Sequence, residues 1–72
     1  MNVTVADIRK IPAGTKKTFR CESGEKLNSA KTLIAYCNRV KKPNDVWKYI
    51  SKSKWEELTI TITAISIEGI KS

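Results

Sequence analysis

The sequence contains no histidine and only two cysteines. Without histidine, the commonest general acid–base group at neutral pH is missing. The only adjacent acids are Glu56 and Glu57, whose side chains point to opposite faces if they lie in a strand. Because there is also no C-x-x-C pair, one chain cannot assemble the usual four-ligand zinc site. These absences predict a protein that is not an enzyme and that needs no metal or other cofactor.

The two cysteines, Cys21 and Cys37, are too few for a domain held together by disulfides, which usually has four or more at this length. Both fall within apolar patterns, and a free cysteine behaves as a small buried hydrophobe. The sequence therefore favours two buried thiols over a disulfide.

No apolar run approaches the roughly 20 residues that a membrane-spanning helix needs. The N-terminal stretch "MNVTVADIRK" lacks the apolar core of a signal peptide. Membrane-surface binding is also disfavoured, because the aromatic residues lie outside the apolar stripe of the expected helix. We expect a soluble cytoplasmic protein with no membrane partner.

Positive charge is what the chain has in excess. Its 72 residues carry 14 Lys and Arg against 7 Asp and Glu, which gives a net charge of +7. A chain of this length forms one domain, residues 1–72, and such a charge attracts polyanions at moderate salt. DNA and RNA are the leading partner candidates, and no small-molecule substrate is implied.

The clearest element is a helix at about residues 24–41. Ser23 is a good N-cap, and Pro43 stops propagation. Apolar residues recur at steps of three and four, which places them on one helix face. They are Leu27, Ala30, Leu33, Ile34, Cys37 and Val40.

The second clear element is a strand within residues 57–67, where apolar residues and threonines alternate and one face is buried. After Ala64 the alternation inverts, which requires a bulge, a bend or the end of the sheet. Residues 45–52 are expected to form its hairpin partner, with residues 51–56 as the connection. Residues 15–21 are a third strand candidate, in which Phe19 and Cys21 share one face.

The first residues are ambiguous. Thr4 and Asp7 match a capping box, which favours a short helical turn through Lys10 over a strand end. Pro12 and Gly14 then mark a turn. The predicted order is strand, helix, strand, strand behind this turn. It corresponds to a two-layer α+β domain with one main helix on a three-stranded, largely antiparallel sheet. The last strand lies in the middle, and the other sheet face is open to solvent.

The aromatic residues allow two registers. An inward Lys48 would be costly to bury unpaired, so the favoured register turns Trp47 and Tyr49 into the core. In the alternative register they lie on the open sheet face as a stacking platform for single strands. Trp55, at the turn, either covers an edge of the core or is exposed.

The charges are unevenly distributed, since residues 38–54 carry six bases and one acid. A basic outer helix face with Asn28 at its start could contact phosphates, although an ordinary solvated face is the favoured interpretation of the helix taken alone. Five further bases flank the Pro–Gly turn, namely Arg9, Lys10, Lys16, Lys17 and Arg20. The candidate nucleic-acid-binding residues are Lys31, Arg39, Lys41, Lys42, Lys52, Lys54 and Trp55.

No motif identifies a family. The leading hypothesis is a small intracellular module that binds DNA or RNA through the basic helix face and the turn lysines, mainly by phosphate contacts. The competing hypothesis is a protein-interaction or assembly module that binds another protein, or itself, through an edge strand or the open sheet face. Its expected apolar patch is Val46, Ile50, Ile65 and Ile67.

Overall fold

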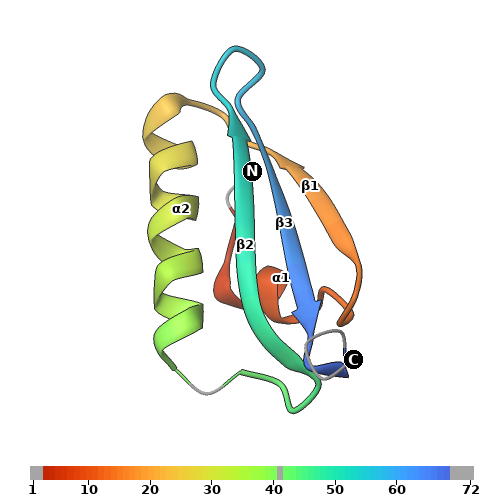
Figure 1. The fold of residues 1–72 in the computed structure, drawn as a ribbon. Helices are drawn as coiled ribbons and strands as arrows, with labels where there is room; N and C mark the ends of the chain where they lie inside the picture. The colour runs from red at the N-terminus through yellow and green to blue at the C-terminus, as the bar shows by residue number, and fades with distance from the viewer. Residues whose placement is uncertain (1–2, 41, 69–72) are drawn as a thin grey trace.

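The computed structural model describes residues 3–40 and 42–68, and it has the predicted α+β order (Figure 1). A short N-terminal helix precedes strand, helix, strand and strand. The elements are α1 (Val5–Arg9), β1 (Lys16–Arg20), α2 (Gly24–Arg39), β2 (Val46–Lys54) and β3 (Thr59–Ser66).

The N-terminal helix α1 is held by the capping box that the sequence predicts. The Thr4 hydroxyl accepts from the Asp7 backbone N–H at 3.2 Å, and the Thr4 backbone N–H donates to the Asp7 carboxylate at 3.0 Å. The Thr4 backbone N–H and the Thr4 hydroxyl both donate to the Asp7 carboxylate, and these two hydrogen bonds lower the pKa of Asp7. The helical turn is therefore confirmed. The turn that follows closes at Gly14, whose φ of 83° suits glycine.

The main helix α2 starts as predicted, with the Ser23 hydroxyl accepting from the Lys26 backbone N–H at 3.3 Å. It ends at Arg39, two residues earlier than expected, because Val40 is already extended (φ −90°, ψ 173°). The residue before Pro43 is Lys42, and a proline disfavours helical backbone there. Lys42 instead donates its ammonium to the Asn38 carbonyl at 3.0 Å, which satisfies one acceptor of the helix end.

The sheet has the order β1-β3-β2, so the last strand lies in the middle and pairs antiparallel on both sides, as predicted. On β3, Ile60, Ile62 and Ala64 are fully buried. The threonines between them face the other way, and the Thr61 hydroxyl lies 2.9 Å from that of Thr18 on β1. Burial of an isoleucine side chain contributes about 1.5–3 kcal/mol, so β3 anchors the sheet to the core.

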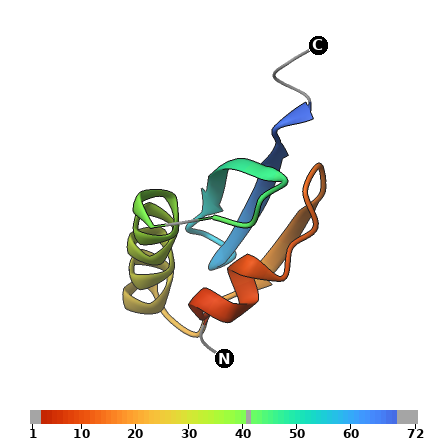
Figure 2. The ribbon, with the colours of Figure 1, turned by 90° about the horizontal axis from the view of Figure 1, so that it is seen from below.

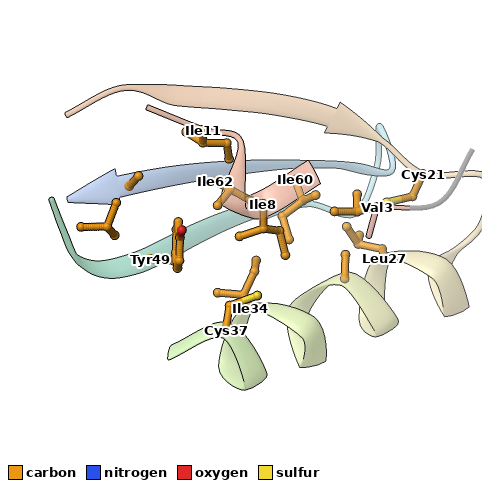
Figure 3. Packing of buried hydrophobic residues seen from close by; sticks show 13 residues of the cluster. Val3, Ile8, Ile11, Cys21, Leu27, Ile34, Cys37, Tyr49, Ile60 and Ile62 are labelled. Carbon is orange, nitrogen blue, oxygen red and sulfur yellow. The ribbon is translucent and has the colours of Figure 1, made fainter. Parts of the chain in front are cut away.

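Both helices lie on the same side of the sheet (Figure 2). The core fills the space between them and the sheet (Figure 3), with Ile8 from α1 and Leu27 and Ile34 from α2 meeting β3. Cys21 and Cys37 are buried free thiols, as predicted. The opposite face of the sheet carries neither helix.

A β-bulge in β2 changes the predicted register. Val46 pairs with Ser66 and Lys48 with Ile65, so Trp47 is an extra residue with no partner of its own. The insertion interrupts the alternation. Tyr49 is therefore buried (1 % exposed), as expected, but so is Val46, while Trp47 is 49 % exposed. The predictions of an inward Trp47 and of an outward Val46 were both wrong. The bulge lies opposite the point where the β3 pattern inverts.

The β2–β3 hairpin is longer than predicted. β2 continues to Lys54, and the turn spans residues 55–58, with Leu58 at a positive φ of 54°. The predicted connection at residues 51–56 began too early, because serines and lysines in alternation can also form an exposed strand.

One side chain ties α2 to the outer edge of β2. The Asn38 amide donates to the Tyr49 carbonyl at 2.9 Å, and its oxygen accepts from the Tyr49 backbone N–H at 2.8 Å. Asn38 thus pairs with the strand edge as a neighbouring strand would, and it satisfies two backbone groups beside the bulge.

Replacing Asn38 with Ala should lower the free energy of unfolding by about 1–3 kcal/mol, because both backbone groups of Tyr49 lose their partner. Urea denaturation followed by circular dichroism measures this. Asn28→Ala on the exposed side of the same helix is the matched control and should change stability little. Equal effects of the two substitutions would contradict the role assigned to Asn38.

The Tyr49 hydroxyl is buried and has no hydrogen-bond partner among the described residues. Burial also raises the pKa of this hydroxyl, so it stays protonated. Tyr49→Phe should therefore leave the free energy of unfolding unchanged or raise it by up to about 1 kcal/mol. A loss of more than about 1 kcal/mol in the same urea experiment would mean that the hydroxyl has a stabilising partner.

Candidate functional site

Strand alternation and register place one set of side chains on the sheet face opposite the helices. We call it the open face. Residues paired directly across two antiparallel strands share a face, so each outward threonine of β3 identifies its outward neighbours on β1 and β2. The open face consists of Lys16, Thr18, Arg20, Lys48, Ile50, Lys52, Lys54, Thr59, Thr61, Thr63 and Ile65.

The bases of the open face form two rows that flank the threonines of β3. One row, Lys16 and Arg20, lies on β1, and the other, Lys48, Lys52 and Lys54, lies on β2. Neighbouring strands are about 4.8 Å apart, so the rows are about 10 Å apart at the backbone. All five bases are exposed, and none of the open-face residues is acidic.

An acid approaches this face at the hairpin end. The Lys54 ammonium lies 3.6 Å from the Glu57 carboxylate, and both side chains are about two-thirds exposed (65 % and 63 %). An ion pair this exposed contributes little to stability and is screened by salt. The described open face therefore keeps a positive potential along most of its length.

An apolar spot lies at the bulge end of the open face. Ile50 is 45 % exposed, and Ile65 is partly exposed on the neighbouring strand. Trp47, the extra residue of the bulge, precedes Lys48, whose pairing partner is Ile65, and the Lys48 ammonium lies 5.7 Å from the centre of the Trp47 ring. We call Trp47, Ile50 and Ile65 the apolar spot. It combines an aromatic ring, aliphatic carbons and a neighbouring cation.

The predicted helix-face residues have other contacts. The Lys31 ammonium lies 5.7 Å from the centre of the Trp55 ring. That ring packs on the start of α2, where a Cβ on Gly24 would lie 3.5 Å from its Cζ3 carbon. Lys42 bonds to the helix end, as described above. Of the predicted helix residues, Arg39 is exposed at the end of α2, and Lys41 lies outside the described residues.

The predicted site is thus divided between two surfaces. Lys52 and Lys54 belong to the open face, whereas Lys31 and Trp55 contact each other along the α2 side of the hairpin. The sequence analysis missed Lys48, and it assigned Lys16 and Arg20 to a turn cluster. The usable signal was the two-residue spacing of Lys16, Thr18 and Arg20 in β1 and of Lys52 and Lys54 in β2, which places each set on one sheet face.

A groove at the β1 edge of the sheet shares Thr18 and Arg20 with the open face but has a different character. It runs between α1 and β1 with an apolar floor that includes Val3 and Phe19, and its rim mixes the acids Asp7 and Glu22 with bases. The Asp7 carboxylate there is held by the capping box.

The Cys37 thiol is buried in the core, and burial raises its pKa, which disfavours the thiolate that nucleophilic chemistry needs.

Within residues 3–40 and 42–68, no group of three or more cysteine, aspartate or glutamate side chains is placed to hold a metal ion. None of the helices described is both long and apolar enough to cross a bilayer. No protein-family model, curated protein or solved structure matches the chain. The geometry and charge of the open face are therefore the basis for a functional proposal.

Proposed function

We propose that the chain binds nucleic acid through the open face, as a non-enzymatic module. The observation that carries this proposal is the charge of that face: five exposed bases in two rows and no acid among the outward residues. A surface that serves solubility alone usually mixes both signs. A face of one sign concentrates polyanions near it and speeds their association.

The geometry supports a phosphate backbone as the ligand. A backbone lying along β3 would have a row of bases on each side, and the threonine hydroxyls between the rows can donate to phosphate oxygens. The outward threonines are Thr59, Thr61 and Thr63, and Thr18 adds a fourth hydroxyl from β1. Phosphate contacts of this kind give affinity without reading the base sequence.

The open face supports this function better than the helix face does. On the helix, the Lys42 ammonium donates to the Asn38 carbonyl, which leaves Lys31 and Arg39 as the described candidate bases there, against five bases on the open face. We therefore propose the sheet, and not the helix, as the nucleic-acid-binding surface. Of the candidate residues predicted from the sequence, Lys52 and Lys54 lie on this surface.

Removing one base from each row tests the proposal. The double variant Arg20→Ala with Lys52→Ala should bind oligonucleotides on the order of tenfold more weakly at low salt. The slope of log K against log salt should also fall, by about 0.7 per lost contact for single strands and 0.9 for duplexes. Fluorescence anisotropy of labelled single-stranded DNA, duplex DNA and RNA across a salt series measures both quantities.

The matched control is Lys31→Ala with Arg39→Ala, which removes one lysine and one arginine from α2. Affinity should change by less than about threefold, because these positions lie off the open face. A larger loss in the control than in the sheet variant would assign binding to the helix. No binding of any oligonucleotide by the wild-type chain at low salt would end the proposal.

The alternative, an assembly module, rests on the apolar spot. Its predicted patch has lost Val46 to the core, and Ile65 and Ile67 are both only partly exposed, so Ile50, with the neighbouring bulge residue Trp47, carries most of what remains. The surrounding bases repel a second copy of the same face. Sedimentation equilibrium distinguishes the two functions, because the nucleic-acid proposal predicts a monomer over the micromolar range in the absence of ligand.

A further inference from the structure

The bulge leaves the Trp47 side chain exposed, so this side chain does not contribute to filling the core. A regular strand would alternate Val46, Trp47 and Lys48, but the extra residue lets Val46 and Tyr49 both point inward while Trp47 is left 49 % exposed. Large aromatic side chains are usually withdrawn from water in a domain of this size. Bulges also recur next to binding sites, where they re-aim a side chain.

The two tryptophans of the chain differ in what they contact. The Trp55 ring packs on Gly24 and lies under the Lys31 ammonium, so it has a structural role at the start of α2. Trp47 is the bulge residue next to Lys48, which pairs with Ile65 on the open face, and the Lys48 ammonium is its cation partner. Exposure is nearly equal, at 49 % and 50 %, so the neighbours, and not the exposed area, distinguish the two rings.

We infer that Trp47 is a base-stacking residue and that the open face takes single-stranded nucleic acid. This inference rests on the proposed function and names its substrate class. An aromatic ring next to aliphatic carbons binds the flat, weakly polar face of a nucleobase. In a duplex that face is covered by the neighbouring base pairs, so only an unstacked base can offer it.

The surrounding charges fit the same ligand. Lys48 lies next to the ring, and Lys52 lies four residues further along β2 on the same face. A strand whose base stacks on Trp47 would place its adjoining phosphates near this row and its onward backbone over the threonines of β3. Single-strand binding sites combine a basic track with aromatic platforms in this way. Neither DNA nor RNA is favoured, because the shared base and phosphate chemistry carries the contact.

Tryptophan fluorescence tests the inference directly, since stacking on a base quenches indole emission. We would use Trp55→Phe, which leaves Trp47 as the only indole, and its matched counterpart Trp47→Phe, which leaves Trp55. The probes are oligodeoxythymidylate, oligouridylate, an abasic deoxyribose-phosphate oligomer and a DNA duplex, all of equal length. Anisotropy of labelled probes measures binding independently of quenching.

The expected result is strong quenching of Trp47 by both single strands, weak quenching by the abasic oligomer and the duplex, and little quenching of Trp55. Trp47→Ala should weaken single-strand binding about tenfold while leaving the abasic oligomer unaffected. If Trp55→Phe fails to fold, the difference in quenching between wild type and Trp47→Phe gives the same answer.

Other outcomes separate the two proposals. Salt-sensitive binding with no quenching of Trp47, or with equal quenching by the abasic oligomer, overturns base stacking and leaves phosphate binding in place. Tighter binding of the duplex than of either single strand overturns the substrate class. Trp47 emission that changes with protein concentration alone would identify the apolar spot as a self-association surface. Absence of any binding overturns both proposals.

Discussion

The one-sided burial of β3 is the constraint on which the rest of the structure depends. Ile60, Ile62 and Ala64 are fully buried beneath the helices, and the threonines between them cannot follow because successive side chains point to opposite faces. Since β3 pairs on both edges, it imposes this division on β1 and β2 through the register. Five of the six bases of β1 and β2 are thereby gathered on the one face that no helix covers, and the sixth, Lys17, pairs with Ile62.

The bulge at Trp47 is the local exception to this division. Because of the bulge, Val46 and Tyr49 of β2 are both buried in the core, and the side chain of Trp47 is exposed at the surface. Asn38 fixes the same segment from the other side by binding both backbone groups of Tyr49. Within the four consecutive residues 46–49 of β2, two side chains thus fill the core and one indole ring is exposed.

Much of the fold could be predicted because its signals are local. The capping box at Thr4, the N-cap at Ser23 and the alternation of β3 each encode their own element, and the central place of β3 follows from its apolar content. The direction of Trp47 could not be predicted, because the inverted alternation after Ala64 indicates an irregularity on β3 but only the pairing with β2 places the extra residue at Trp47. The open face was predicted, but its basic character was missed for a related reason. Its bases come from strands separated by α2, and only the register brings Arg20 and Lys52 onto one surface.

Backbone amide chemical shifts measure most directly whether the open face is the binding surface. On titration of the isotope-labelled chain with a short single-stranded oligonucleotide at low salt, we expect the largest changes on β1, β2 and β3, centred on the threonine row and extending to Trp47. The amides on the exposed side of α2, including Arg39, should move little. Shifts concentrated on α2 with an unchanged sheet would contradict the account.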